Sequence, residues 1–385
     1  MDSTLPLGVR MFRSLEELED RASEWNALVK ESETSTIYQT FEWHASWLSA
    51  FGKRVEPLIL MVEEQKVLVG IAPLMCTSRW FWGSTRRVIE FIGAAASGTC
   101  DLIVKRTHPG VRSLILNWLM EHRDLWDALD LIDVPGGSGT LEIFPPFFRQ
   151  RGLRTDTRMI YEAPTRILQD RWADWRVTRT ANLRRQRNRM RRQGRCEFKH
   201  LTTGDAIAPF LEKFFELHIR RRQVTPMPSF FLDDAYKTFY RSMIRKLAEK
   251  EQIILFVEFL NQVPIAMGFA LEYADRSIAY QHTFDLDYER FSPGTLLAMH
   301  MLDDAVERRR GEFDLAAGEQ PYKYRVTNYS RSLYALRVFQ HLADYGRMRV
   351  ILGFKDLVSR SPRALALAHR VTNRLGFAPQ VSTLR

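Results

Sequence analysis

Cysteine is scarce in this 385-residue sequence, and no apolar run is long. Its three cysteines, Cys76, Cys100 and Cys196, are too widely spaced for a metal-ligand pattern or a disulfide framework. The best apolar run, from Val67 to Met75, is interrupted by a glycine and a proline and is too short to cross a membrane. The first residues also lack the apolar core of a signal peptide. We therefore expect no bound metal and a cytoplasmic, reducing location, with peripheral attachment at the inner membrane as the alternative.

Acidic residues are absent from one long stretch of the chain. The segment Arg176 to Arg195 contains nine arginines and no Asp or Glu, whereas the net charge of the whole chain is +10. The tail after His341 is also basic. Positive charge confined to segments predicts an anionic partner at those segments, and a tRNA, a carrier protein or a membrane surface would fit Arg176–Arg195. The alternative is a solvated face paired with acids elsewhere.

The order of predicted elements occurs twice along the chain. Leu58–Val62 and Val67–Met75 predict a hairpin, and Ile253–Phe259 and Val263–Tyr273 predict a second one around Asn261-Gln262. Each hairpin is followed by a strand, a helix and a strand. This repetition predicts an α/β (α+β) fold of two tandem units, each a mixed, mostly antiparallel sheet flanked by helices.

We divide the chain into three parts. Residues 1–165 form an acceptor-shaping or scaffold unit, and residues 166–345 form a donor-binding, catalytic unit. Residues 346–385 form a basic helical tail that packs on the second unit or lies on anionic lipid.

The segment from Ala279 to Arg325 carries the strongest functional signal. It predicts a strand, a capped helix, a short strand and a polar loop. Unpaired N–H groups at a helix start bind anions. Ser292 suits the N-cap, Pro293 suits the first helical position, and Gly294 would allow a ligand to approach the backbone. The predicted phosphate-binding residues are Arg290, Ser292, Gly294, Thr295 and Leu296; a capped helix without a ligand is the alternative.

Three short motifs resemble a known family. They are Phe291-Ser292-Pro293-Gly294-Thr295-Leu296-Leu297, Phe313-Asp314-Leu315 with Gly318, and Glu319 with Tyr322-Lys323. Together with the duplicated layout they resemble the tandem GNAT acyltransferases of the cellulose-biosynthesis CelD-like family, related in architecture to the FemABX transferases. The resemblance implies two GNAT-like units and direct attack of an amine or hydroxyl on an acyl thioester.

The resemblance also implies acyl-CoA or acetyl-CoA as the cosubstrate. Its acceptor would be a cell-envelope or exopolysaccharide precursor. Typical GNAT enzymes use a loop with two small residues for the cofactor pyrophosphate, whereas here a single glycine follows Arg290. An acyl-carrier protein or an aminoacyl-tRNA is therefore the alternative donor.

Five polar residues are the catalytic candidates. His282 is the preferred base, because the pKa of histidine is near working pH. Strand alternation places Tyr280, His282 and Phe284 on one face. Asp285 is a second candidate base or a turn cap, and Glu319 is a further candidate base. Tyr322 would act as the acid that protonates the leaving thiolate. Lys323 would hold a phosphate or the acceptor's anionic group.

Two other functions compete with acyl-CoA-dependent transfer. One is a FemABX-like transferase that uses aminoacyl-tRNA, which the arginine helix favours. The other is a non-catalytic module that binds nucleic acid or an anionic polymer through Arg176–Arg195. Affinity for tRNA that falls steeply with salt would indicate either of these two.

Overall fold

The computed structural model describes residues 8–81, 84–168, 181–225, 228–317 and 321–359, and it divides the chain into two compact units. The first contains residues 1–161 and 332–385, and the second contains residues 162–331. The division after residue 161 lies close to the boundary expected at 165. Residues 332–345 belong to the first unit rather than the second, because the last strand pairs with a strand of the first unit.

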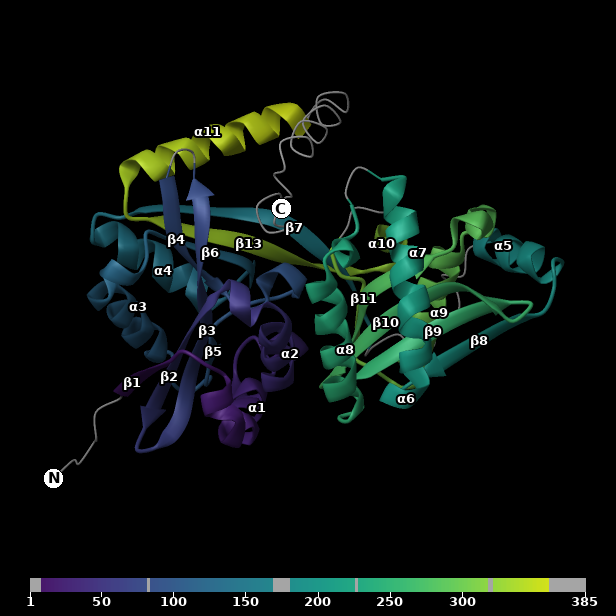
Figure 1. Ribbon diagram of the computed structural model, residues 1–385, viewed down its shortest axis with the longest axis horizontal. Helices are drawn as coiled ribbons and strands as arrows, with labels where there is room; N and C mark the ends of the chain where they lie inside the picture. The colour runs from purple at the N-terminus through teal and green to yellow at the C-terminus, as the bar shows by residue number, and fades with distance from the viewer. Residues whose placement is uncertain (1–7, 82–83, 169–180, 226–227, 318–320, 360–385) are drawn as a thin grey trace. The chain divides into compact units, whose positions relative to one another are not determined.

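The first unit is a sheet in the order β1-β2-β3-β4-β6-β13-β7, with β5 paired to β3 (Figure 1). The expected hairpin is present, and its two turn residues, Gln65 and Lys66, have positive φ angles of 50° and 68°. A buried apolar cluster that includes Leu60, Ile115 and Phe148 joins the sheet to its helices. The strands are β1 (Gly8–Phe12), β2 (Glu56–Glu64), β3 (Val67–Phe81), β4 (Ser84–Phe91), β5 (Ile103–Val104), β6 (Ala128–Pro135), β7 (Arg154–Ile167) and β13 (Tyr329–Phe339). The α-helices are α1 (Ala22–Glu31), α2 (Phe41–Phe51), α3 (Val111–Glu121), α4 (Gly139–Gln150) and α11 (Leu342–Ser359).

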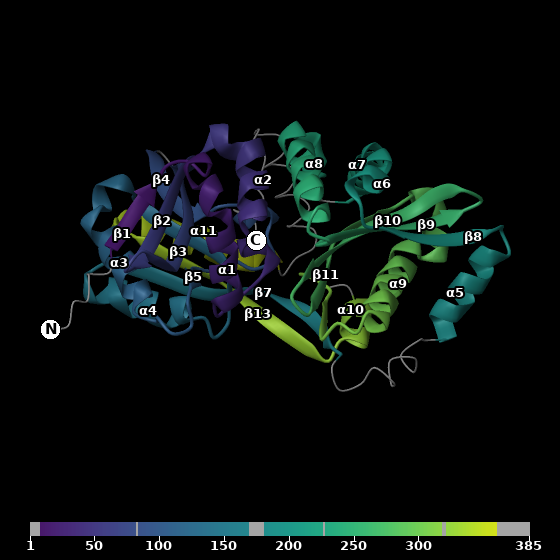
Figure 2. The same cartoon turned by 90° about the horizontal axis from the view of Figure 1, so that it is seen from below.

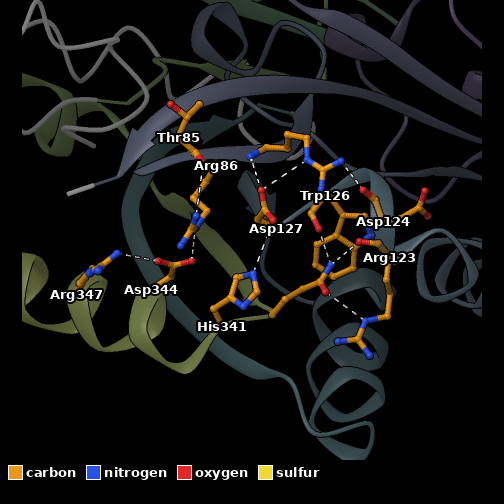
Figure 3. Close-up of polar contacts among 11 residues, drawn as sticks. Thr85, Arg86, Arg123, Asp124, Trp126, Asp127, His341, Asp344 and Arg347 are labelled. Atoms are coloured by element: carbon orange, nitrogen blue, oxygen red, sulfur yellow. Dashed lines mark hydrogen bonds and ion pairs between the residues drawn. The ribbon is translucent and has the colours of Figure 1, made fainter. Parts of the chain in front are cut away.

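The basic tail begins within α11, whose described side chains pack on the first unit. Figure 3 shows the polar contacts at its start, where Arg86 of β4 donates to Asp344 at 2.7 Å and His341 lies 3.7 Å from Asp127. Met348 and Phe339 add an apolar contact with β4 and β6. Residues 360–385 lie outside the described part of the chain. Among the helices that are described, none combines the length and the apolar character needed to cross a bilayer.

The second unit repeats the architecture, with strands in the order β7-β12-β11-β10-β9-β8. Its hairpin turn uses Asn261 and Gln262, with φ angles of 51° and 67°, as in the first unit. The strands of this unit are β8 (Cys196–Leu201), β9 (Ile253–Leu260), β10 (Val263–Tyr273), β11 (Arg276–Phe284) and β12 (Glu312–Asp314). The α-helices are α5 (Ala181–Arg191), α6 (Gly204–Ile207), α7 (Leu211–Gln223), α8 (Asp234–Ala248), α9 (Pro293–Glu307) and α10 (Pro321–Val326).

The two faces of this second sheet carry different helices, as Figure 2 shows: α9 covers one face, and α7 and α8 cover the other. Leu297 and Met301 of α9 pack on Phe256 and Ala270. On the opposite face, Phe214 of α7 lies 4.9 Å from Phe269 between ring centroids. Phe269 and Ala270 are adjacent along β10, so their side chains enter the two cores on opposite faces of the sheet.

Candidate active site at the open edge of strand β11

Strands β11 and β12 pair in parallel and then separate. Their register pairs are Arg276 with Glu312, Ser277 with Phe313, and Ile278 with Asp314, where β12 ends. Strand β11 continues to Phe284, so among the described strands residues 279–284 have no partner on this side. An unpaired strand edge presents backbone N–H and C=O groups that a ligand with amide groups can bind.

A β-bulge lies on this open segment. Phe269 of β10 is opposite Gln281, and Ala270 is opposite Ala279, so Tyr280 is an extra residue. The ring of Tyr280 stacks on Tyr240 of α8, with centroids 5.9 Å apart. The bulge interrupts the alternation of side chains, so the prediction that Tyr280 shares a face with His282 and Phe284 was wrong.

His282 lies on the α9 face of the strand. A Cβ atom added to Gly268 would lie 3.0 Å from the Cβ of His282 and 3.0 Å from Leu297 of α9. Burial lowers the pKa of His282 to about 3, and the nearby charges of Arg221, Lys323 and Arg222 act in the same direction. At neutral pH the imidazole is therefore uncharged, and the expectation of a pKa near working pH was wrong.

The start of α9 has fewer available donors than we expected. Ser292 occupies the N-cap in the left-handed conformation, with φ 54°, and its side chain makes no capping bond. Its carbonyl already accepts the N–H groups of Thr295 and Leu296 at 3.0 and 3.1 Å. Pro293 has no N–H, so Gly294 supplies the remaining donor of this turn, together with the positive end of the helix dipole.

The ring of Phe284 lies against Gly294. A Cβ atom added to Gly294 would be 3.0 Å from Cδ1 of Phe284 and 3.7 Å from Cδ2 of His282. The glycine therefore allows the ring of Phe284 to pack on the helix, and it brings the helix start close to His282. The expected multidentate phosphate cradle over Ser292, Gly294 and Thr295 is reduced to one N–H group.

Arg290 and Asp285 flank this turn. The guanidinium of Arg290 lies over the ring of Phe291, 4.8 Å from its centroid, and the residue is exposed. Asp285 accepts the N–H of Asp287 at 3.1 Å and an N–H of Arg220 at 3.0 Å. These contacts make Asp285 the turn cap that we considered for it.

Lys323 lies in a helix and not in the expected loop. Its Nζ atom donates to the carbonyls of Leu315, Ala316 and Ala317 at 2.8, 3.2 and 2.9 Å. Burial lowers the pKa of Lys323 to about 8, opposed by the charge of Asp314. The ammonium thus fixes the segment that follows β12, where Ala316 has a φ angle of 55°.

Tyr322 and Glu319 complete the predicted set. Tyr322 is in the first turn of α10. Glu319 lies outside the described residues. The structure therefore places His282 beside the start of α9 and within reach of the charge of Lys323. Asp285 is instead paired with Arg220.

Three residues of α7 at this edge were not predicted. Arg221 donates to the backbone carbonyl of His282 at 3.2 Å, and its guanidinium lies 4.4 Å from the centroid of Phe284. Arg222 and buried His218 lie on the same helix. Burial lowers the pKa of His218 to about 3, with Arg222 and Arg221 adding to the effect. Arginines in the last turn of a helix are common, so the sequence offered no signal for this role.

The corresponding position in the first unit is filled by its own loop. Strands β4 and β6 pair at Val88–Ala128 and Ile89–Leu129. Beyond these pairs, the carbonyl of Asp133 in β6 accepts the N–H of Cys100 at 2.9 Å. Buried Asp101 fixes the loop by accepting the hydroxyls of Ser138 and Thr140 at 2.6 and 2.5 Å. The open strand edge is therefore a feature of the second unit.

Comparison with known proteins bears on the fold of the chain. Residues 178–324 match the family model described as Acetyltransferase (GNAT) domain. No curated protein sequence matches the chain. The fold is similar to the crystal structure of FemX, with 11% identity and a TM-score of 0.58, over 82% of this chain and 95% of FemX.

Two further solved structures share the fold. L-PGS from Bacillus licheniformis is 11% identical, with a TM-score of 0.51, over 88% of this chain and 96% of that protein. A conserved protein from Bacteroides thetaiotaomicron is 10% identical, with a TM-score of 0.52, over 86% of this chain and 100% of that one. The chain therefore has a tandem GNAT-like fold, and residues 178–324 match a family model of a GNAT acetyltransferase domain.

Proposed function

We propose that the second unit transfers an acyl group from acyl-CoA to an amine or hydroxyl. The observation that carries this proposal is the open edge of β11 at residues 279–284, beside the start of α9. A pantetheine arm contains amide groups that can pair with such an edge as an added strand would. The phosphates of the carrier would approach Arg221, Arg222 and the N–H of Gly294.

The bulge at Tyr280 supports a role in polarising the thioester. A bulge leaves a backbone group unpaired in the ladder, and an N–H directed at the thioester oxygen would stabilise the negative charge that develops there. The acceptor nitrogen or oxygen would bond to the carbonyl carbon, and the carbon–sulfur bond would then break. The thiolate leaves with the electron pair and takes up a proton.

His282 is our proposed base. Burial is the main cause of its low pKa of about 3, and the nearby cations lower this pKa further. An anionic donor bound beside Arg221 and Arg222 would offset their charge, which raises the proton affinity of the imidazole when the substrate is present. We therefore expect the imidazole to be a stronger base in the complex.

The acceptor class rests on the resemblance to the CelD-like family. That resemblance favours a cell-envelope or exopolysaccharide precursor, and we assign acceptor shaping to the first unit. Its filled loop around Cys100 and Asp133 supports a scaffold role rather than a second donor site.

Thermal unfolding with acetyl-CoA and longer acyl-CoAs tests the donor. Ligand at 100 times Kd should stabilise the protein by about 2.7 kcal/mol. A thiol-release assay with amino-sugar and polyamine acceptors then tests turnover. His282→Gln should lower kcat by about 100-fold or more while preserving acyl-CoA binding.

His200→Gln is the matched control, because His200 is an exposed histidine of β8 in the same unit. This control should keep full activity. If no acyl-CoA shifts the unfolding temperature and no thiol is released, coenzyme A is not the carrier. Equal activity of the two variants would exclude His282 as the base.

A further inference from the structure

Helix α5 and the turn after it carry a dense set of arginines. Six of the seven are exposed, and none forms an ion pair with an acid in the part of the chain that the structure describes. Charge runs normally pair with acids on neighbouring elements, so this surface is an exception. The seven residues, which we call the arginine surface, are Arg184, Arg185, Arg187, Arg189, Arg191, Arg192 and Arg195.

This surface is held rigidly on the second unit. Met190 is 1% exposed and packs against Phe291 and Leu296, at the turn that begins α9. The position of α5 on the α9 side of the sheet can be followed in Figure 2. The anchored helix therefore fixes the backbone positions from which the arginine side chains extend, which reduces the entropy lost on binding.

A second anchor fixes the end of the helix. The side chain of Asn261, in the β9–β10 turn, accepts the N–H of Arg195 at 2.9 Å and donates to the carbonyl of Gln193 at 3.2 Å. Gly194 has a φ angle of 155°, and a Cβ atom there would lie 1.9 Å from Oδ1 of Asn261. The chain can therefore make this close contact only with glycine at residue 194.

The arginines cover a wide arc of the helix. At about 100° per residue, the positions from Arg187 through Arg184 to Arg189 span about 200°, with Met190 on the opposite side. A single acidic helix of a partner protein would contact one stripe of this arc. A groove of a nucleic acid has a row of phosphates on each side, and it would contact both flanks of the helix.

The exposed side chains also argue against a membrane. Every described exposed residue between 184 and 195 is an arginine, an asparagine or a glutamine. Helices that bind at a bilayer surface insert apolar or aromatic side chains, and this exposed surface has none. Guanidinium groups instead match phosphodiester oxygens, which they bind in a bidentate manner.

We propose that the arginine surface binds the phosphodiester backbone of a nucleic acid. RNA and DNA share this chemistry, and the experiment separates them. Because Met190, opposite the arginines, packs on Leu296, helix α5 would lie between the nucleic acid and the start of α9. This binding does not depend on the proposed acyl transfer.

The test measures fluorescence anisotropy of a labelled RNA hairpin and of a DNA duplex of equal length, at about 50 and 200 mM salt. The variant Arg185→Glu/Arg189→Glu/Arg192→Glu removes one flank of the surface. We expect the affinity of this variant to fall by 100-fold or more. The slope of log Kd against log salt concentration should decrease by about 2 to 3. The probe that the unmodified chain binds more tightly, RNA or DNA, identifies the source of the phosphates.

Two matched variants complete the design. Lys66→Glu/Arg245→Glu/Lys250→Glu makes the same change of charge at exposed sites elsewhere and should bind within about threefold of the unmodified chain. Arg185→Lys/Arg189→Lys/Arg192→Lys keeps the charge but loses bidentate contacts, so it should bind with intermediate affinity. Thermal unfolding confirms that each variant is folded.

Three outcomes would overturn the proposal. One is equal loss of affinity in the two glutamate variants, which would indicate attraction by net charge alone. Another is stronger binding to phosphatidylglycerol vesicles than to either nucleic acid. The third is the absence of measurable nucleic-acid binding at the lower salt concentration.

Discussion

At the residue scale, the sequence indicated which side chains could do chemistry, but it could not indicate their protonation states or hydrogen-bond partners. His282 lies beside the start of α9, but burial, and then the charges of Arg221, Lys323 and Arg222 on other elements, lower its pKa. Lys323 was expected to face a ligand, and instead it donates to three carbonyls. Such states depend on contacts between distant segments, which no local pattern records.

Replacing Lys323 with methionine tests its structural role. The substitution keeps most of the side-chain volume but leaves the carbonyls of Leu315, Ala316 and Ala317 without their donor. We expect a loss of about 2 to 3 kcal/mol in the free energy of unfolding, and weaker acyl-CoA binding because the end of β12 is no longer fixed. Lys246→Met, on α8, is the control, and urea denaturation measures both. A loss of activity without any loss of stability would favour a direct catalytic role for Lys323.

Glu258 in β9 is a buried carboxyl that sequence patterns did not identify. It is 3% exposed, and burial raises its pKa to about 8. Between about pH 4.5 and 8, the folded state therefore holds a proton that the unfolded state has lost, so stability must fall as the pH rises. Glu258→Gln has no carboxyl to titrate, so its free energy of unfolding should not fall in this window. As the pH rises, the variant should therefore become more stable than the unmodified chain by about 1.4 kcal/mol per pH unit. Urea denaturation between pH 5 and 8.5 measures it, and a constant difference would show that Glu258 is ionised in the folded protein.

At the element scale, the prediction was most accurate where turns and periodicity are local. Both hairpins are present, and the strand, the capped helix and the short strand expected after the second hairpin are β11, α9 and β12. The bulge at Tyr280 and the separation of β11 from β12 were missed, because each depends on pairing with another strand. Helix α10 was missed because Pro321 and nearby Gly318 suggested a loop.

Gly268 determines how closely α9 approaches the sheet. A Cβ atom there would lie 3.0 Å from His282 and from Leu297, and 3.4 Å from Met301. Gly268→Ala should therefore destabilise the protein by about 1 to 3 kcal/mol and reduce acyl-CoA affinity by moving the helix. Gly110→Ala, where a Cβ atom would meet nothing within 4 Å, should change stability little. A neutral Gly268→Ala variant would mean that α9 can shift without cost.

At the scale of the whole molecule, duplication was visible in the sequence, but the path of the chain was not. The matching order of elements predicted two units of similar architecture. It could not predict that β13 returns to the first unit, pairing Leu336 with Leu131 and Val338 with Leu129 of β6. Pairing across about 200 residues is a property of the fold, and it makes the first unit discontinuous in sequence.

This discontinuity predicts how fragments behave. Residues 1–161 alone lack β13, which lies between β6 and β7, so they should expose apolar strand surface and aggregate. The backbone of Asn328 donates to Thr165, and its side chain accepts the N–H of Ile167, so the segments leading out of and back into the first unit run side by side. A two-residue Asn-Gly turn that joins Tyr161 directly to Ser332 should therefore restore a folded first unit. Size-exclusion chromatography and cooperative thermal unfolding would distinguish the joined chain from the fragment. If residues 1–161 fold equally well alone, β13 is not required to complete the sheet of the first unit.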